Sequence, residues 1–333
     1  MQFAIVTGSS GFIGSALSNY LLSKNMVVFG VDKEDTKISH KYYFHLSLDV
    51  SMHENMIKLE SKVIDIIDKY NILKENIFVC HLAAKISVKD SMTNLYDYYN
   101  NNTVSTLNIL EFMHKNNLNN IYFSSTAAVY NSNYISNNKL LLEEGPLKSE
   151  SVYGNTKKLA EDIILDYGKQ FNITGYIFRF FNVAGGRDTL YPPHHLIPIL
   201  IDSFNKNKSW KIYGSDYPTK DGSCVRDYVH VNDIANAFYL AMQKRNNIVD
   251  TINLGSGCGY SVRKIMDMTS SILTSSINEN NNNNINIYEY KRRPGDPPFL
   301  VADINKAKNV LNWSPEYSIQ VTIKDTITSY NTK

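Results

Sequence analysis

The sequence predicts an α/β protein with a doubly wound parallel sheet and a smaller, discontinuous α+β domain. Short apolar runs alternate with segments of helical periodicity over the first 180 or so residues of the 333-residue chain. These runs are continuously apolar, which is expected where helices cover both faces of a parallel sheet. A turn containing three glycines joins the first run to the first helix.

The first strand and helix form a unit suited to binding a dinucleotide. The strand is expected at Phe3 to Val6 and the helix at Ile13 to Leu22, with Gly8, Gly11 and Gly14 between or just inside them. Glycines at this position let the backbone approach a pyrophosphate, whose charge then lies on the amides of the helix N-terminus.

An acidic residue strengthens this interpretation. A second apolar run, Val27 to Val31, ends in Asp32, where a carboxylate can hold a ribose 2′-hydroxyl. A carboxylate repels a 2′-phosphate, so the cofactor is predicted to be NAD rather than NADP. The alternative is a glycine-rich hairpin or helix cap without a ligand, and the matching strand, helix and acid favour the dinucleotide site.

The remaining elements follow the same alternation as far as residue 182. Strands are expected at 44–50, 77–84, 121–125 and 174–180, and helices at 57–67, 96–113 and 152–171. After that, strands at 227–231 and 251–254 are expected to return to the first sheet around a helix at 233–242. We therefore expect an NAD-binding domain over residues 1–182, joined again by 225–255, and a substrate domain from 183–224 and 256–333.

Two local features lie in the second part of the chain. Ser261 is expected to cap a helix that runs to Leu273. Residues 278–286 are nearly all asparagine, a composition that cannot form a core, and they are expected to be an exposed loop.

Composition excludes several classes of partner. With 43% hydrophobic residues, 20% charged residues and a net charge of +2, the chain favours neither nucleic acid nor a membrane surface. No apolar run is long enough to span a bilayer. Three widely separated cysteines indicate free thiols in a reducing compartment, so a cytoplasmic location is expected. His194 and His195 are adjacent and have no cluster of acids or thiols, so no metal site is expected.

Tyr153 and Lys157 are the candidate catalytic pair. They lie one helical turn apart on the same face of the helix expected at 152–171. A nearby ammonium favours the phenolate form of tyrosine, which can then take a proton from an alcohol. Thr126 stands at the carboxyl end of a strand, where ligands of open α/β sheets bind, and can hydrogen-bond a substrate hydroxyl. Taken alone, each of these features also fits a helix-surface pair or a turn cap.

Together these features resemble the extended short-chain dehydrogenase/reductase superfamily over essentially the whole chain. The longer motifs of this chain are similar to those of UDP-glucose 4-epimerases. They are HLAA at 81–84, RFFNVAG at 179–185, HLIP at 195–198, IYGSDYPT at 212–219, DG at 221–222, VRDYVHV at 225–231 and RRPGD at 292–296.

The resemblance implies a Rossmann-type fold, tightly bound NAD, a UDP-hexose substrate and epimerisation by transient oxidation at carbon 4. The catalytic residues would be Tyr153, Lys157 and Thr126. NAD would contact Gly8, Gly11, Phe12, Ile13, Gly14, Asp32, Asp49, Val50, Leu82, Ala83, Ala84, Asn101, Tyr153, Lys157 and Phe181. The substrate would contact Thr126, Asn182, His195, Leu196, Lys211, Tyr213, Arg226, Arg293 and Asp296. A homodimer through the helices that follow Tyr96 and Val152 is also implied.

Other activities stay open. Epimerases of UDP-N-acetylglucosamine or UDP-glucuronate differ mainly in pocket width, which the family controls at the position of Leu300. A nucleotide-sugar 4,6-dehydratase would place an Asp-Glu pair after the strand threonine, where this chain has Ala127 and Ala128. An NAD-sensing protein without activity is disfavoured, because such relatives lose the tyrosine or the lysine.

Overall fold

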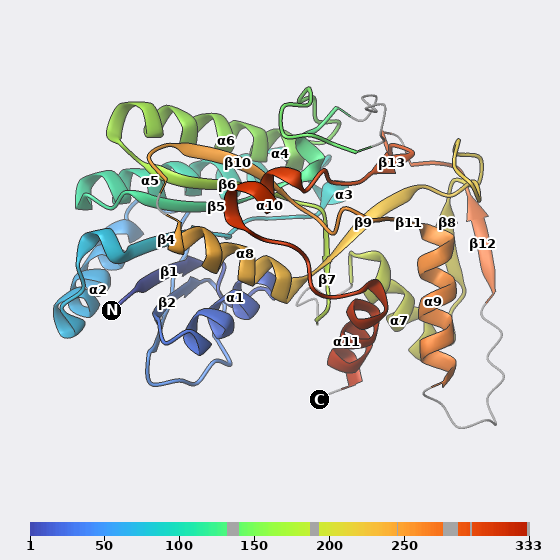
Figure 1. The fold of residues 1–333 in the computed structure, drawn as a ribbon, viewed down its shortest axis with the longest axis horizontal. Helices are drawn as coiled ribbons and strands as arrows, with labels where there is room; N and C mark the ends of the chain where they lie inside the picture. The colour runs from blue at the N-terminus through green and yellow to red at the C-terminus, as the bar shows by residue number, and fades with distance from the viewer. Residues whose placement is uncertain (132–139, 187–192, 245, 276–285, 294, 332–333) are drawn as a thin grey trace.

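A parallel sheet carries the first part of the chain in the computed structural model, which describes residues 1–131, 140–186, 193–244, 246–275, 286–293 and 295–331. The strands of this sheet are β1 (Phe3–Thr7), β2 (Val27–Asp32), β3 (Tyr43–Ser47), β4 (Ile77–His81), β5 (Asn120–Thr126), β6 (Thr174–Phe180) and β10 (Val249–Leu254). They pair in the order β10-β6-β5-β4-β1-β2-β3, and every pairing is parallel (Figure 1). The predicted doubly wound α/β fold is confirmed.

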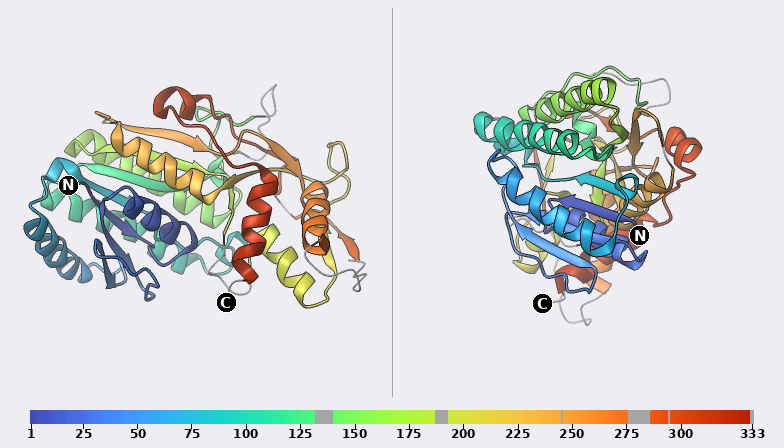
Figure 2. Two further views of the ribbon diagram at one scale, coloured as in Figure 1. Left: turned by 60° about the horizontal axis from the view of Figure 1, so that its bottom comes forward. Right: turned by 90° about the vertical axis from the view of Figure 1, so that its left-hand side faces the viewer.

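Helices cover both faces of this sheet (Figures 1 and 2). They are α1 (Phe12–Ser23), α2 (Asn55–Tyr70), α5 (Ser105–Asn116), α6 (Val152–Phe171) and α8 (Val231–Gln243). Successive strand residues face opposite helix layers: Ala4 and Val6 lie in the core with α1 and α8, whereas Phe3 and Ile5 lie in the core with α2, α5 and α6. Because both faces are buried, the strands have the continuously apolar sequence from which they were predicted.

Three segments differ from the prediction by more than small shifts of their ends. Strand β4 ends at His81 rather than at residue 84, and beyond it the amide of Ala83 donates to the side-chain hydroxyl of Thr7 (3.2 Å) instead of to the backbone of a neighbouring strand. Strand β3 ends at Ser47 rather than at residue 50, and beyond it the Asp49 carboxylate accepts the amide of Ser51 (2.9 Å) to form a turn. The single helix expected at 96–113 is instead α4 (Leu95–Tyr98), a π-helical segment at Tyr99–Val104, and α5.

The second part of the chain has its own small sheets and core. Its elements are β7 (Asn182–Ala184), α7 (Leu196–Asn205), β8 (Trp210–Tyr213), β9 (Val225–His230), β11 (Gly259–Ser261), α9 (Val262–Ser275), β12 (Ile287–Tyr290), β13 (Phe299–Leu300), α10 (Asn305–Leu311) and α11 (Ile319–Asn331). Helices α7, α9 and α11 pack around a separate apolar cluster that includes the fully buried Trp210 (Figure 1).

One of the two strands expected to rejoin the first sheet does not. Strand β10 pairs with β6, as predicted, whereas β9 pairs with β7, β11 and β13 in the second part of the molecule. The apolar composition of β9 shows that it is buried but not which sheet buries it. Most of the asparagine-rich stretch at 278–286 lies outside the described residues.

Candidate active site

The glycine turn between β1 and α1 leaves no room for side chains. Gly8 has a φ of +71°, and a Cβ on it would lie 2.8 Å from the backbone nitrogen of Ala83. A Cβ on Gly14 would overlap the carbonyl oxygen of Gly8. Gly11 is the N-cap of α1 and has no side chain with which to occupy the first amides of that helix. These amides can therefore receive an anion such as a pyrophosphate.

The residues predicted to hold the cofactor gather at one edge of the sheet. Phe12 and Ile13 begin α1, and Asn101 lies in the π-helical segment before α5. Asp32 ends β2, Asp49 and Val50 follow β3, Leu82, Ala83 and Ala84 follow β4, and Phe181 follows β6. Since the strands are parallel, their carboxyl ends meet at this edge, where ligands of open α/β sheets bind. The residues present thus fit a dinucleotide, and their individual contacts with NAD stay a prediction.

Lys33 links three of these elements and was not predicted from the sequence. Asp32 accepts the amide of Ser10 (2.9 Å) from the glycine turn. The next residue, Lys33, pairs its ammonium with Asp49 (2.8 Å) and donates to the Asn101 side chain (3.1 Å). The ends of β2 and β3 and the segment before α5 are therefore connected by one side chain. Its place directly after the acid that ends β2 is the signal that could have identified it.

Local backbone geometry sets how closely α6 approaches the end of β5. The side chain of Ser151 caps the helix by accepting the amide of Gly154 (3.0 Å). A Cβ on Gly154 would lie 2.5 Å from the carbonyl oxygen of Ala128, so a larger residue would push the helix away from the strand end. The first turn of α6 therefore lies directly against the residues that follow β5.

This approach brings the predicted catalytic residues together. The hydroxyl of Tyr153 hydrogen-bonds the side chain of Thr126. The buried ammonium of Lys157 donates to the carbonyl oxygen of Ser124 (2.6 Å) and lies 4.5 Å from the centre of the Phe123 ring. Phenol, ammonium and strand hydroxyl thus share one strand end, as the sequence predicted.

The prediction of a lowered pKa for Tyr153 is wrong for the protein alone. Burial raises the pKa of the Tyr153 phenol to about 12, although the hydrogen bond with Thr126 acts in the opposite direction. Burial also lowers the pKa of the Lys157 ammonium to about 7, although the carboxylate of Glu161 raises it. Because desolvation opposes both charges, a phenolate here needs further positive charge, such as that of an oxidised nicotinamide.

Two arginines lie on the predicted substrate side in different environments. Arg226 is buried on β9 and donates to Asp296 (2.7 Å) and to the carbonyl of Pro297 (2.9 Å). Part of the Arg226 guanidinium is therefore already paired with a carboxylate. The guanidinium of Arg293 lies 4.2 Å from the centre of the Tyr213 ring and makes no ion pair with the residues that the structure describes.

The remaining predicted substrate residues lie in the same part of the molecule. Asn182 begins β7 and donates to the carbonyl of Asp227 on β9 (3.0 Å). His195 and Leu196 form the start of α7, and Lys211 is an exposed residue of β8. The structure therefore places these residues on three elements of the second part of the chain, and their contact with substrate stays a prediction.

Comparison with known proteins gives a consistent relationship over the whole length. A family model described as GDP-mannose 4,6 dehydratase matches residues 5–326. The chain is 31% identical over 323 residues to a UDP-glucose 4-epimerase of Corynebacterium glutamicum, which covers 94% of this chain and 91% of the relative. The chain belongs to the UDP-glucose 4-epimerase family.

Solved structures of epimerases have the same fold as this chain. The UDP-glucose 4-epimerase of Bifidobacterium longum, in complex with NAD+ and UDP, is similar with a TM-score of 0.86 at 28% identity, over 100% of this chain and 99% of that one. The UDP-Glc/GlcNAc 4-epimerase of Campylobacter jejuni is similar with a TM-score of 0.81 at 27% identity, over 100% of both chains.

Two buried charged residues beneath the epimerase-type site were missed at the sequence level. Glu161 lies on α6 one turn beyond Lys157, and Arg179 lies in β6. The guanidinium binds the carboxylate through two nitrogens, at 3.0 and 2.7 Å. An arginine within the apolar run at 174–180 is itself unusual, because a charged side chain in a buried strand requires a buried partner. That signal could have led to Glu161.

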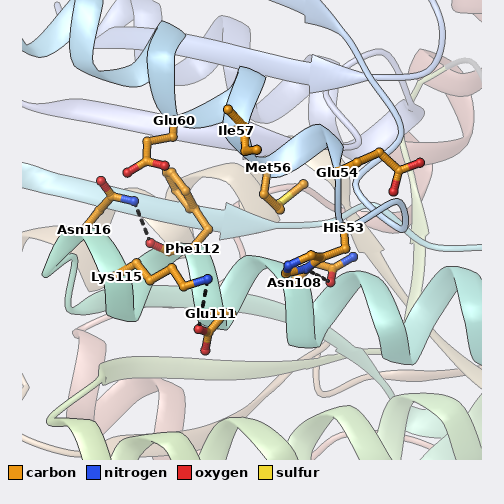
Figure 3. Close-up of a pocket in the computed structure, with 10 residues that line it drawn as sticks. All are labelled: His53, Glu54, Met56, Ile57, Glu60, Asn108, Glu111, Phe112, Lys115 and Asn116. Atoms are coloured by element: carbon orange, nitrogen blue, oxygen red, sulfur yellow. Dashed lines mark hydrogen bonds and ion pairs between the residues drawn. The ribbon is translucent and has the colours of Figure 1, made fainter.

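A small pocket lies away from these residues, between α2 and α5 (Figure 3). It is lined by His53, Glu54, Met56, Ile57, Glu60, Asn108, Glu111, Phe112, Lys115 and Asn116. None of the residues predicted for the epimerase site belongs to this set.

Among the described residues no group of three His, Cys, Asp or Glu side chains could hold a metal ion. No helix in that part of the chain is long and apolar enough to cross a bilayer.

Proposed function

We propose that this protein is an NAD-dependent UDP-hexose 4-epimerase that interconverts UDP-galactose and UDP-glucose. The observation that carries the proposal is the grouping of Tyr153, Thr126 and Lys157 at the end of β5, on the same sheet edge as the glycine turn. Such a site holds a base for an alcohol proton next to a place for a dinucleotide. Family membership supports the same activity.

Tyr153, Thr126 and Lys157 have separate roles in the proposed reaction. Tyr153 takes the proton from the 4-hydroxyl of the sugar and returns it at the end of the reaction. Thr126 orients the phenol and the substrate hydroxyl, since its side chain already hydrogen-bonds Tyr153. Lys157 supplies positive charge beside the phenol from a fixed position under Ser124. NAD, when bound, supplies the oxidation at carbon 4 and the reduction that follows it. No net redox change results, so the cofactor stays bound between turnovers.

Arg293 and Arg226 are the proposed contacts of the nucleotide diphosphate. A planar guanidinium suits the oxygens of a diphosphate, and Arg293 makes no ion pair with the described residues that would compete with it. One guanidinium nitrogen of Arg226 donates to Asp296, and this hydrogen bond fixes the orientation of the Arg226 side chain. The other proposed substrate contacts are Asn182, His195, Leu196, Lys211, Tyr213 and Asp296.

One assay tests the activity. Purified protein incubated with UDP-galactose, without added cofactor, is expected to form UDP-glucose, and the supernatant of the denatured protein is expected to contain NAD. Release of a keto-deoxy sugar would instead identify a 4,6-dehydratase. The Ala127–Val129 segment after Thr126 argues against that outcome, because its first two residues are alanines that supply neither acid nor base. Absence of both products from an NAD-loaded protein would favour a binding protein.

The sugar that fits is a second question. Leu300 on β13 is the register partner of Arg226 on β9, so it lies beside a proposed diphosphate contact. A medium-sized aliphatic residue there leaves space for UDP-hexoses. Whether N-acetylated UDP-hexoses are also accepted is decided by assay. One similar structure is described as a UDP-Glc/GlcNAc 4-epimerase. Comparing kcat/KM for UDP-galactose and UDP-N-acetylgalactosamine separates the two specificities, and Leu300→Tyr is expected to reduce only the second.

The proposed assembly is a homodimer through α5 and α6. These helices pack together, and their outer faces expose Leu107 (38%), Leu159 (40%) and Phe171 (42%). Large apolar side chains at a shared surface are typical of an interface between subunits. Light scattering is expected to give twice the chain mass, and Leu107→Glu with Leu159→Glu is expected to give monomers.

The proposed location is the cytoplasm. Cys80 and Cys224 are buried free thiols, and Cys258 is an exposed one. Thiols left unpaired in this way are usual in a reducing compartment. Fractionation of the source cells tests the location directly.

A further inference from the structure

Three consecutive residues of β5 contact three residues of α6 that are spaced four apart. Thr126 hydrogen-bonds Tyr153, and Ser124 accepts from Lys157 at 2.6 Å. Between them, Ser125 donates to the carboxylate of Glu161. The proposed catalytic pair therefore continues into a third contact of the same kind, one turn further along the helix.

The third contact is fixed more firmly than the other two. Glu161 is 2% exposed and Arg179 is 4% exposed. The guanidinium of Arg179 donates to both carboxylate oxygens of Glu161, at 3.0 and 2.7 Å. Arg179 is the register partner of Ser125 across the β5–β6 pair, so both ligands of the carboxylate come from neighbouring strands. Its remaining donor group binds the Tyr130 hydroxyl (3.0 Å) and the carbonyl of Glu143 (2.9 Å). A carboxylate held in this way cannot turn to another partner.

We propose, building on the proposed function, that Glu161 is a positioning residue whose carboxylate, held by Arg179, keeps the Lys157 ammonium charged beside Tyr153. A buried ammonium tends to lose its proton unless an opposite charge lies close to it. Lys157 has carbonyl and ring neighbours at Ser124 and Phe123, but Glu161 is the carboxylate that favours its charged form.

The charged and titratable groups around Lys157 come from three elements. Tyr153 and Glu161 lie on α6, Arg179 faces Glu161 from β6, and His81 lies on β4. Burial lowers the pKa of His81 to about 3, with a smaller contribution from Lys157, so His81 is neutral in the neutral range. Glu161 is therefore the group whose removal changes the charge of Lys157 most directly.

The test separates this role from simple compensation of Arg179. Glu161→Gln alone removes the carboxylate that neutralises the buried Arg179, which is strongly destabilising, so the main variant is Glu161→Gln with Arg179→Met. Neutral replacements of similar size for both members of a buried pair are often tolerated. We expect this double variant to retain NAD and KM. The basic limb of its kcat profile is expected to move to lower pH by about one unit, because Lys157 loses its proton earlier. An unmoved limb in the NAD-loaded double variant overturns the proposal.

Glu161→Asp serves as the conservative variant. It keeps the charge that compensates Arg179 but withdraws the carboxylate by one methylene group from Lys157. The same limb is expected to move in the same direction by a smaller amount, and this variant retains the buried ion pair if the double variant fails to fold. Ser125→Ala, which leaves both charges in place, is the matched control and is expected to change the limb least. Equal pH profiles for the wild type and Glu161→Asp would contradict the role.

A second readout does not depend on turnover. The pKa of Lys157 is about 7 in the folded protein and 10.5 as a free side chain, so the unfolded state binds more protons between these values. Stability therefore rises with pH across this window. In the double variant the rise is expected to begin about one pH unit lower, and adding Lys157→Met is expected to remove it. A wild type inactive on UDP-galactose would sink the proposed function alone, whereas an unchanged window in the double variant would sink the role of Glu161.

Discussion

The two parts of the molecule differ in how their functional residues are brought together. At the end of β5, Tyr153 and Lys157 come from adjacent turns of one helix and contact Thr126 and Ser124 of one strand. In the second part, Arg226 meets Asp296 across 70 residues of sequence, and β9 takes partners from three separate segments. The Lys157–Ser124 contact of the first site spans 33 residues of sequence, less than half the separation of Arg226 and Asp296.

This difference decides what each part does with its charges. The β5–α6 site buries an ammonium, a carboxylate and a guanidinium in fixed contacts, so small changes there act on protonation. The second part leaves Arg293 stacked on Tyr213 without an ion pair among the described residues. A guanidinium without a partner carboxylate is suited to receive a ligand's charge. The first part should therefore control turnover, and the second should control substrate affinity.

Tyr153→Phe is the strongest test of the first half of this comparison. It removes the hydroxyl that hydrogen-bonds Thr126 and leaves the ring in place. Steady-state assays with UDP-galactose are expected to show kcat reduced by about 10²- to 10⁴-fold, the usual contribution of a positioned acid–base group. Bound NAD, measured in the denatured supernatant, is expected to be unchanged.

The matched control is Tyr167→Phe on the same helix. Its hydroxyl lies 3.5 Å from Glu111, away from the end of β5. We expect wild-type kcat from this variant. Near-normal turnover in Tyr153→Phe would show that the phenol is not the base.

Arg293→Met tests whether the second part of the molecule controls substrate affinity. Losing a charge-assisted contact to a diphosphate is expected to raise KM by about 10- to 100-fold, while kcat changes little. Arg263→Met is the control in the same part of the molecule, because Arg263 is already paired with Glu289 on β12. A large fall in kcat with constant KM would mean that the second part takes part in the chemical step, and the proposed division would fail.

The same contrast explains how much the sequence could predict. Helix α6 and strand β6 were predicted with their observed bounds, because apolar periodicity is a local signal. The partners of β9 were predicted wrongly, because strand composition reports burial but not which distant strand lies alongside. The shift in the pKa of Tyr153 was predicted in the wrong direction. The effect of burial depends on the packing around the ring, which the sequence spacing of Tyr153 and Lys157 does not reveal.

Two buried histidines extend the comparison to stability. Burial lowers the pKa of His81 to about 3 in the first part, and burial lowers the pKa of His230 in the second, where Asp325 (3.3 Å) acts against the shift. A folded pKa below the free value of 6.5 means that the unfolded state binds more protons, so stability falls as the pH drops below 6.5.

Replacing these histidines measures the contribution of each. The loss of stability due to His81 is at most about 1.4 kcal/mol per pH unit. In urea titrations between pH 5 and pH 6.5, His81→Gln is expected to flatten this dependence more than His230→Gln. Equal slopes for the two variants would show that the carboxylate beside His230 makes no difference, compared with the threonine hydroxyls that bind His81.

Lys33→Met is expected to have the smallest effect and refines the description of the first part. Lys33 joins Asp49 and Asn101, two predicted cofactor contacts, but its side chain is 49% exposed, and exposed ion pairs contribute roughly 0.2–1 kcal/mol. The rate of NAD release is therefore expected to rise by no more than about fivefold. The preference for NAD over NADP should persist because Asp32 is untouched. Lys62→Met, which removes an exposed pair with Asp65 on α2, is the control and is expected to release NAD at the wild-type rate. Equal release from all three proteins would mean that the glycine turn and Asp32 retain NAD without help from the Lys33 bridge.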